Sequence, residues 1–224
     1  MSFYDEHPKF YISTDCIIFG YFDNKLHVLL HPRDMTPGQG EPSLMGGFVD
    51  DDESVDNAAK RVVTQLTGLE DFYIEQVGAF GNVDRDPGER VVSVCYYVLI
   101  KALNYSEELR REYNAEWVEI DKVPTLYGDH NTMLERAHKI LREKLAWTPV
   151  AFHLIAEKFT LTQLQTLYET IYGEILDKRN FRKKLTEANH IINTGEIDRT
   201  TSKRGAYLFS FDFDGYKKDG IFKL

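Results

Sequence analysis

The stretch from Gly46 to Leu69, GGFVDDDESVDNAAKRVVTQLTGL, places the strongest constraint on the fold of this chain. We expect its two opening glycines to adopt positive φ and to bring the backbone close to a ligand. Four acidic residues then precede Ser54, a residue type that caps helix N-termini. Apolar residues recur after it at helical spacing, and Gly68 stands where helices commonly end. The stretch predicts a glycine loop that leads into an amphipathic helix.

This stretch resembles the Nudix box, the loop–helix–loop pattern G-x5-E-x7-R-E-U-x-E-E-x-G-U, in which U is aliphatic. The residues that match the pattern are Gly47, Glu53, Arg61, Val63, Gly68 and Leu69. The three remaining glutamates of the pattern are replaced by Val62, Gln65 and Leu66. In Nudix hydrolases these glutamates gather Mg²⁺ or Mn²⁺, hard cations that require oxygen ligands. We therefore expect a Nudix scaffold without metal, cofactor or catalytic residues, in which Glu53 and Arg61 brace the loop.

The pattern up to about residue 125 is dominated by strands, and a helix follows. The expected strands are Phe10 to Phe22, Leu26 to His31, Tyr73 to Ala79, Val91 to Ile100 and a short one at Glu116 to Val118, and the helix is His130 to Leu145. The resemblance to a Nudix domain covers roughly Pro8 to Ala146. It implies an α+β protein with a Nudix-like α/β/α sandwich and a mixed sheet, which we place at residues 1–147.

Two segments of this domain are candidates for ligand contact. One is the loop rich in proline and glycine at residues 32–47, and the other surrounds Pro87-Gly88, which suits a type II turn. The alternative is that both are solvated loops. Because the second segment is similar to the equivalent part of Nudix proteins that act on ADP-ribose and related sugars, we favour ligand contact. The candidate ligand-binding residues are Arg33, Ser43, Gly46, Gly47, Phe48, Asp84, Arg85, Asp86 and Arg90.

The C-terminal part, residues 148–224, has a different composition and a different pattern. From Val150 onward 12 Lys/Arg stand against 10 Asp/Glu, although the whole chain has a net charge of −9. A short helix is expected at Phe152 to Phe159, a second around Leu164 to Ile171, and a third after Asp177. Apolar runs at Ile191-Ile192 and Tyr207 to Phe211 then suggest paired strands. Three helices followed by a two-stranded wing predict a winged helix-turn-helix domain.

Basic residues of the third helix and the wing point to double-stranded DNA. A basic helix can enter the major groove while wing residues meet phosphates, and we expect Asn180 and Arg182 to contact bases. The candidate DNA-binding residues are Lys178, Arg179, Asn180, Arg182, Lys183, Lys203 and Arg204. The alternatives are a merely solvated basic face and a winged helix that binds protein. Because one such domain offers few phosphate contacts beside an acidic partner domain, we expect a homodimer on an operator with two half-sites.

Other features favour a cytoplasmic protein without membrane contact. The N-terminus lacks the basic and apolar regions of a signal peptide, and no apolar run is long enough to cross a bilayer. The two cysteines, Cys16 and Cys95, lie in strand-like apolar runs. We expect both to be buried thiols, without a disulfide or a metal.

A Nudix-like domain without its glutamates, joined to a winged helix, resembles the Nudix-related transcriptional regulators. The stretches that carry this likeness in the C-terminal part are FTLTQLQTLYETIYGEILDKRNFRKKL and SKRGAYLFSF. Members of that family are dimers that bind operator DNA and sense a metabolite, either a sugar such as arabinose or a nucleotide-derived ligand such as ADP-ribose. The resemblance implies a non-enzymatic, metabolite-responsive regulator. Because the metal site is lost, we favour a monosaccharide or sugar derivative as the effector.

The alternative from another class is an active Nudix hydrolase of a nucleoside-diphosphate-linked compound, with an accessory winged helix. In that case the acidic run from Asp50 to Glu53 would hold the metal in place of the missing glutamates. Four acids before a helix are more simply explained as partners of the helix dipole in a solvated loop.

Overall fold

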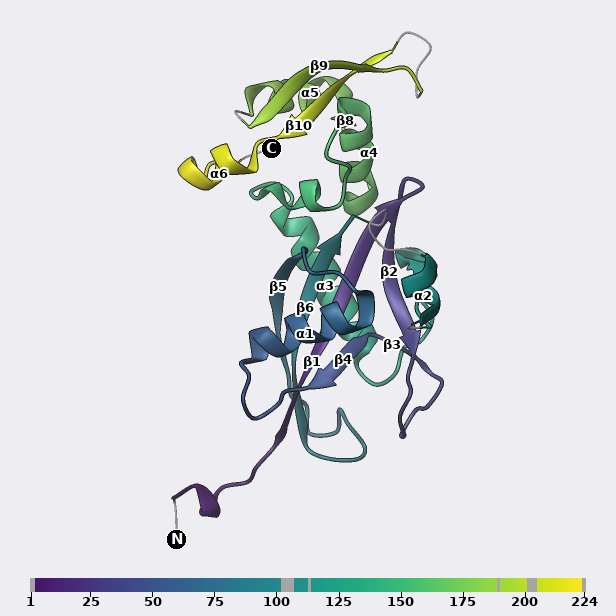
Figure 1. Cartoon of the computed structure of the whole chain (residues 1–224), viewed down its shortest axis with the longest axis vertical. Coiled ribbons are helices and arrows are strands. Elements are labelled where there is room, and N and C mark those ends of the chain that lie inside the picture. Colours follow the sequence, from purple (N-terminus) through teal and green to yellow (C-terminus); the bar gives the residue numbers. More distant parts are fainter. Residues whose placement is uncertain (1–2, 102–106, 113, 189, 201–204, 223–224) are drawn as a thin grey trace.

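The computed structural model describes residues 3–101, 107–112, 114–188, 190–200 and 205–222. A larger part is built on a mixed sheet, and a smaller part stacks on its end (Figure 1). The elements of the larger part are η1 (Phe3–Glu6), β1 (Tyr11–Phe22), β2 (Lys25–Pro32), β3 (Pro42–Ser43), β4 (Met45–Phe48), α1 (Val55–Thr67), β5 (Tyr73–Phe80), β6 (Val91–Ile100), α2 (Glu107–Glu112), β7 (Glu116–Glu119), η3 (Ile120–Lys122) and α3 (His130–Lys144).

The sheet runs in the order β3-β2-β1-β6-β5, with β4 also paired to β1 and β7 to β2. The long central strands β1 and β6 are parallel, in a register that pairs Tyr11 with Val91 and Gly20 with Ile100. The β1–β2 and β5–β6 pairs are antiparallel. The predicted mixed sheet is therefore confirmed.

Helices α1 and α3 cover opposite faces of this sheet, which makes the predicted sandwich. Along β1 the side chains alternate between the two cores. Ile17 and Phe19 pack in the core that contains α3, whereas Cys16 and Ile18 pack in the core that contains α1. Both cysteines are buried and free, as the sequence predicts.

Helix α1 has the ends that its sequence predicts. The Ser54 side chain accepts a hydrogen bond from the Asn57 backbone N–H at 3.2 Å, and Gly68 ends the helix in the left-handed conformation at φ 69°. Its buried residues are Ala58, Ala59, Val62, Val63 and Thr67. The predicted amphipathic helix is confirmed, whereas the two glycines before it lie in strand β4.

The smaller part contains a second sheet, in the order β8-β10-β9, beside two helices. Its elements are η4 (Pro149–His153), β8 (Phe159–Thr160), α4 (Leu161–Tyr172), α5 (Lys178–Glu187), β9 (Ile191–Asp198), β10 (Ala206–Phe211) and α6 (Phe213–Asp219). Helix α4 begins with a capping box between Thr160 and Gln163, and Asp177 caps α5. This is the predicted winged helix with a third strand added.

The predicted short helix at Phe152 to Phe159 is wrong. A 3-10 turn, η4, ends at His153, and Phe159 instead lies in a strand paired with Phe209. The reason is tertiary: Phe159 and Thr160 complete the wing sheet, and Thr160 is needed outside the helix to cap α4. The apolar pattern of the sequence did not predict helix α6. The Phe213 ring of this helix packs on His153 at a centroid distance of 4.9 Å.

One hydrophobic core runs through both parts. It includes Phe19 of β1, Met133 and Leu141 of α3, and Tyr168 of α4. Helix α3 packs on one face of the sheet and its C-terminal end reaches the winged helix, so the core is continuous from one part to the other (Figure 1). No helix in the described ranges combines the length and apolar character that a membrane span requires.

Candidate functional site

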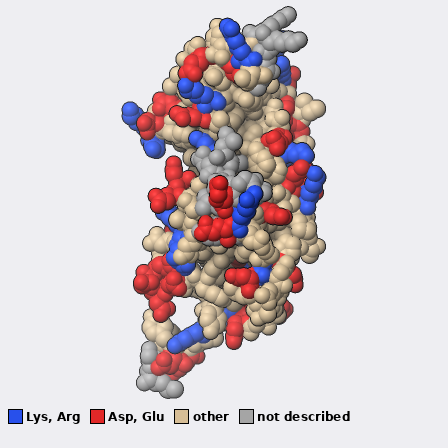
Figure 2. All heavy atoms as spheres, turned by 45° about the vertical axis from the view of Figure 1, so that its right-hand side comes forward, with Lys and Arg blue, Asp and Glu red and all other residues tan. Residues whose placement is uncertain are grey.

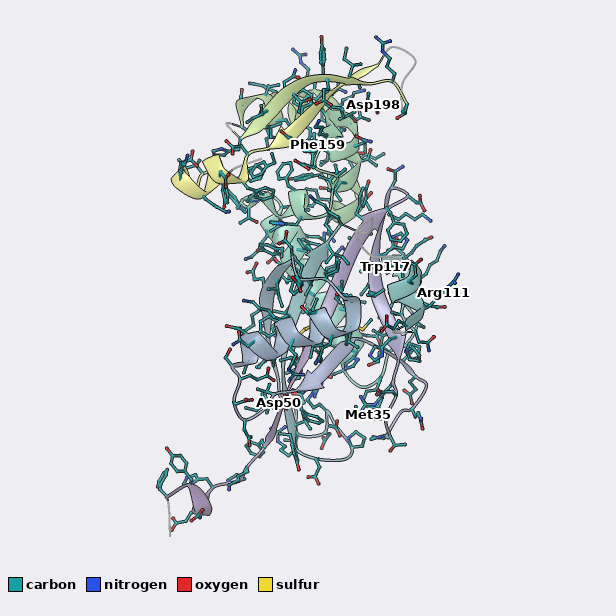
Figure 3. The ribbon with its side chains drawn as sticks, viewed as in Figure 1. Met35, Asp50, Arg111, Trp117, Phe159 and Asp198 are labelled. Carbon is teal, nitrogen blue, oxygen red and sulfur yellow. The ribbon has the colours of Figure 1, made fainter. Side chains whose placement is uncertain are left out.

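A pocket opens at the end of the sheet remote from the winged helix, between β1, β4, the loop after β2, the loop after β5 and the start of α3. Its volume is about 90 Å³. Met35 and Asp50 lie on loops at this end of the sheet (Figure 3). The residues that line the pocket are Ser13, Asp15, His31, Arg33, Asp34, Met35, Ser43, Leu44, Gly46, Gly47, Phe48, Arg85, Asp86, Val91, Tyr127, Asp129 and His130.

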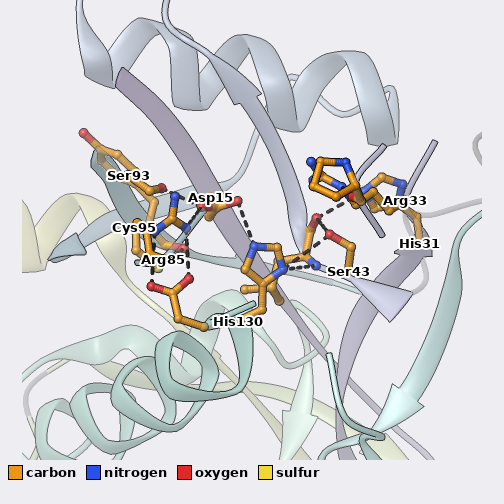
Figure 4. Close-up of polar contacts among 12 residues, drawn as sticks. Asp15, His31, Arg33, Ser43, Arg85, Ser93, Cys95 and His130 are labelled. Carbon is orange, nitrogen blue, oxygen red and sulfur yellow. Dashed lines mark hydrogen bonds and ion pairs between the residues drawn. The ribbon is translucent and has the colours of Figure 1, made fainter. Parts of the chain in front are cut away.

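A buried ionic cluster forms the floor of this pocket (Figure 4). The Arg85 guanidinium donates to both carboxylate oxygens of Asp129, at 2.9 and 3.2 Å, and its Nη2 lies 3.4 Å from Asp15 Oδ2. The Ser93 hydroxyl donates to the same Asp15 oxygen at 2.5 Å. Only 7% of the Arg85 side chain is exposed, so its charge is neutralised by these carboxylates.

His130 joins this cluster to Ser43 and Leu44, at the end of β3. Its Nδ1 accepts a hydrogen bond from the Leu44 backbone N–H at 3.2 Å, and Ser43 Oγ lies 3.3 Å from the same nitrogen. The ring proton therefore belongs on Nε2, which lies 3.5 Å from Asp15 Oδ1. Burial lowers the pKa of His130, and the nearby Asp15 opposes that effect. The imidazole is neutral near pH 7 and links Asp15 to the Ser43–Leu44 backbone.

The two glycines serve a different purpose from the one that the sequence predicts. Gly46 and Gly47 lie in β4, paired with Asp15 and Thr14, and neither has positive φ. The expectation of positive φ is wrong, because strand pairing with β1 holds this backbone extended. Glycine is needed at both positions because there is no room for a side chain. A Cβ on Gly46 would lie 2.5 Å from Asp15 Oδ1, and one on Gly47 would lie 2.9 Å from Val62 Cγ2.

The structure brings seven of the nine candidate ligand-binding residues to this pocket: Arg33, Ser43, Gly46, Gly47, Phe48, Arg85 and Asp86. Arg33 stacks over the Tyr127 ring at 4.2 Å, and 49% of Phe48 is exposed at the rim. Arg85 lies in the floor rather than on a solvated loop.

Asp84 and Arg90 are the two candidates that do not line the pocket. Asp84 is exposed, and the Arg90 guanidinium donates to the carbonyl oxygens of Gly81 and Asn82 at 2.9 and 3.0 Å. The predicted type II turn at Pro87-Gly88 is also wrong, since Gly88 does not have positive φ. The Asp86 side chain instead accepts the Gly88 N–H at 2.8 Å and holds this loop closed.

Sequence reasoning missed seven polar residues of the pocket: Ser13, Asp15, His31, Asp34, Tyr127, Asp129 and His130. Asp15 was detectable in principle, because a lone carboxylate inside the apolar strand DCIIFGYF needs a buried partner. The others carry no local signal. They reach the pocket through the sheet pairing and through the position of α3.

The Nudix-like helix retains its scaffold. The predicted Glu53–Arg61 pair is present, and Arg61 also donates to the Phe48 carbonyl oxygen at 2.9 Å. Val62 is buried against Gly47, at a position where the Nudix pattern has a glutamate. Within the residues that the structure describes, no group of three or more His, Cys, Asp or Glu side chains is placed to hold a metal ion.

Helix α5 presents the candidate DNA-binding residues at the far end of the molecule. Lys178, Arg179, Asn180 and Lys183 are exposed, while Phe181 and Leu185 are buried as predicted. Arg182 is half-buried, and its Nη2 lies 3.3 Å from Thr162 Oγ1 of α4. Lys203 and Arg204 lie outside the described residues.

The surface charge differs between the two parts. On the face shown in Figure 2, acidic side chains form dense groups over the Nudix-like half, whereas basic and acidic side chains alternate toward the winged-helix end. This agrees with the uneven charge of the sequence. A sandwich with a polar pocket, joined through one core to a winged helix with an exposed basic helix, defines a ligand-responsive DNA-binding protein with a Nudix-like domain.

Comparisons with known proteins give the family. Residues 13–141 match the NUDIX domain, and residues 151–211 match the NrtR DNA-binding winged helix domain. The chain is 32% identical to the ADPR responsive transcriptional repressor NtrR of Acinetobacter baylyi, over 94% of this chain and 86% of that protein. The chain belongs to the NrtR family of Nudix-related transcriptional regulators.

Two further comparisons bear on the fold and the Nudix-like part. The crystal structure of Shewanella oneidensis NrtR complexed with a 27mer DNA superposes with a TM-score of 0.83 at 29% identity, covering 92% of this chain and 95% of that one. An ADP-ribose pyrophosphatase of Methanocaldococcus jannaschii is 26% identical over 62% of this chain and 78% of that protein. The first comparison extends over both parts of the molecule, and the second spans a shorter stretch.

Proposed function

We propose that this protein is a transcriptional repressor whose Nudix-like domain, residues 1–147, binds ADP-ribose and whose winged helix, residues 148–224, binds operator DNA. The observation that carries this proposal is similarity over nearly the whole chain to a relative named as an ADPR responsive repressor. The similarity to an NrtR that was crystallised with DNA supports the DNA-binding half.

ADP-ribose replaces the neutral sugar that the sequence favoured. That preference rested on the loss of the metal ligands, and a relative named for its response to ADPR argues against it. The pocket offers ADP-ribose suitable groups without a metal. Asp15, Ser43 and His130 can exchange hydrogen bonds with ribose hydroxyls, and Arg33 at the rim can meet a phosphate oxygen.

The size of the pocket indicates how such a ligand lies. Pockets for small molecules usually enclose about 300–1,000 Å³. The volume of this pocket, about 90 Å³, is below that range, so only part of ADP-ribose would lie inside it and the rest would extend across the rim. Met35 and Phe48, each 49% exposed, form that rim and can cover an aromatic base.

The same residues support binding rather than hydrolysis. Glu53, which the hydrolase alternative needs as a metal ligand, is engaged by Arg61, and the Arg61 guanidinium also lies 3.4 Å from Asp50 Oδ2. This pair is also part of the Nudix pattern; what supports binding is that Val62, Gln65 and Leu66 replace the other three glutamates and offer a hard cation only one neutral amide oxygen. We propose that the protein binds ADP-ribose without turning it over.

On the DNA side, Lys178, Arg179, Asn180 and Lys183 are the proposed contacts on α5. Lys203 and Arg204, which lie outside the described residues, are proposed from the sequence alone. Two copies of the chain on an operator with two half-sites would double the number of phosphate contacts. ADP-ribose would favour one arrangement of the protein and so change the operator affinity by about 1–3 kcal/mol.

The test is a fluorescence anisotropy titration of operator DNA, taken upstream of the protein's own gene and its neighbours, with ADP-ribose, arabinose and no ligand. We expect specific binding that weakens steeply with salt and changes with ADP-ribose alone. A response to arabinose but not to ADP-ribose would overturn the effector assignment. Release of AMP and ribose phosphate from ADP-ribose with Mg²⁺, at about one turnover per second, would restore the hydrolase alternative.

A further inference from the structure

Helix α3 connects the pocket directly to the winged helix. Its N-cap, Asp129, is a pocket residue, and the Asp129 side chain makes no capping hydrogen bond because it binds Arg85 instead. Its C-terminal end meets α4, where the Tyr168 hydroxyl donates to the Leu145 carbonyl oxygen at 3.3 Å. With 15 residues, α3 extends about 22 Å between these ends.

Helix α3 is packed along its whole length. Its buried residues His130, Met133, Leu134, Ala137 and Leu141 are spread along its length, on the face that packs against the sheet. A close-packed interface of this kind passes a displacement on rather than absorbing it locally. A shift at Asp129 is therefore expected to appear at Leu145.

The C-terminal end of α3 is tied to both parts of the molecule. Lys144 forms an ion pair with Glu75 of β5, and Glu75 also accepts hydrogen bonds from the hydroxyls of Tyr73 and Tyr97, at 2.6 and 2.8 Å. The Thr148 hydroxyl donates to the Lys144 carbonyl oxygen at 2.9 Å, at the entry to the winged helix. The last turn of α3 is thus bonded directly to Thr148, the residue before η4 of the winged helix.

A second contact between the two parts lies elsewhere. The Thr170 hydroxyl of α4 is 3.2 Å from the Asn24 carbonyl oxygen, in the turn of the β1–β2 hairpin. This turn lies at the end of the sheet nearest the winged helix, and Asn24 is not among the residues that line the pocket (Figure 1). It can act as a fixed point about which the winged helix turns.

We propose that α3 carries the effector signal, with Asp129 as the positioning residue at the pocket and Tyr168 as the residue that receives the displacement at the winged helix. The inference rests on the proposed function. A ligand whose hydroxyls or phosphates approach Arg85 competes with Asp129 for the guanidinium, and the first turn of α3 then shifts. Through Leu145 and Tyr168 this shift reorients α4, on which α5 packs.

The experiment uses the full-length protein and three measurements for each variant. These are the Kd for operator DNA alone, the Kd for ADP-ribose by calorimetry, and the Kd for operator DNA with saturating ADP-ribose. The ratio of the two DNA constants is the coupling factor. Tyr168→Phe removes one hydroxyl from the α3–α4 contact, Tyr172→Phe makes the same change one turn further along α4, and Thr170→Val removes the hairpin contact.

For Tyr168→Phe we expect both separate Kd values to stay within about threefold of wild type, and the coupling factor to fall by about fivefold, as for one lost hydrogen bond. Tyr172→Phe and Thr170→Val should keep the wild-type coupling factor. Should Tyr168→Phe fold poorly by circular dichroism, Thr148→Val tests the same end of α3 and should also lower the coupling factor.

Asp129→Asn tests the pocket end. The amide keeps the shape of the side chain but loses its charge, so the coupling factor should fall together with a change in ADP-ribose affinity. A wild-type coupling factor in Tyr168→Phe, or a loss of coupling in Thr170→Val instead, would overturn the proposal and place the signal in the hairpin. If the wild-type protein bound operator DNA without responding to ADP-ribose, the proposed function itself would fail.

Discussion

Arg61 donates hydrogen bonds from Nε and Nη2 to the two carboxylate oxygens of Glu53, eight residues earlier in the chain. The bridge closes the loop between β4 and α1, and Glu53 also accepts the Asp50 backbone N–H at 3.0 Å. The Arg61 guanidinium lowers the pKa of Glu53 to about 2, so the carboxylate stays ionised. The Nudix-like loop has therefore kept its brace although its helix lacks the other three glutamates of the pattern.

Gly46→Ala should disrupt the pocket. The new methyl group would lie 2.5 Å from Asp15 Oδ1 and 3.1 Å from the Thr14 carbonyl oxygen, so the ionic floor has to shift. We expect at least a tenfold loss in ADP-ribose affinity by calorimetry, with a lower thermal midpoint. Gly81→Ala is the matched control, because its Cβ would make only ordinary contacts, at 3.5 Å, with Val92. If Gly46→Ala and Gly81→Ala had the same ADP-ribose affinity and thermal midpoint, close contact with Asp15 would not be what requires glycine at position 46.

Arg85→Met should destabilise the fold strongly. It leaves the carboxylates of Asp15 and Asp129 buried without their cation, a change that typically costs about 3–5 kcal/mol. The measurement is urea unfolding followed by tryptophan fluorescence. Arg142→Met, at an exposed position of α3, should change the unfolding free energy by no more than about 0.5 kcal/mol. A small effect at Arg85 would mean that the two carboxylates are solvated or protonated.

Stability should decrease on acidification, in part through His153. Burial and the nearby Lys101 lower the pKa of His153 to about 4, against 6.5 for an ordinary histidine. Above about pH 6.5 the ring is neutral in both states. Between those two values the unfolded chain takes up a proton that the folded chain does not, so stability is lost as the pH falls.

The check is the urea midpoint at about pH 7 and about pH 5. The loss should be smaller in His153→Gln than in wild type. His7→Gln, at an exposed position of the N-terminal turn, should follow wild type. The rest of the loss in stability comes from other buried and half-buried histidines, since burial also lowers the pKa values of His27, His31, His130 and His138. If the urea midpoint of His153→Gln fell as much as that of wild type, His153 would not contribute to the pH dependence of stability.

Arg179→Ala and Lys183→Ala should weaken operator binding through electrostatics alone. Both side chains are exposed on α5, and a lost phosphate contact reduces the slope of log K against log salt by about 1. Arg182→Ala should in addition lower the stability of the winged helix, because its guanidinium packs at Thr162. Lys139→Ala, exposed on α3, is the control and should leave the salt dependence unchanged. If the salt dependence of operator binding were unchanged in Arg179→Ala and Lys183→Ala, DNA would bind to a surface other than α5.

The sequence by itself determined the elements whose signals are local. Ser54 and Gly68 set the ends of α1, Asp177 starts α5, and the apolar run from Cys16 predicted the strand β1 with its buried thiol. Caps and periodicity depend on residues a few positions apart, so they can be recognised without the fold.

Only the tertiary structure decided the pocket and its connection to the winged helix. Asp15 and Arg85 are 70 positions apart, and Arg85 and Asp129 are 44 apart. They meet because β1, the loop after β5 and the start of α3 converge at one end of the sheet. The pairing of β4 with β1 also holds the Gly46 backbone extended, whereas the sequence predicted a positive φ there. Where a side chain's partner is set by strand order rather than by spacing, its role cannot be found in the sequence alone.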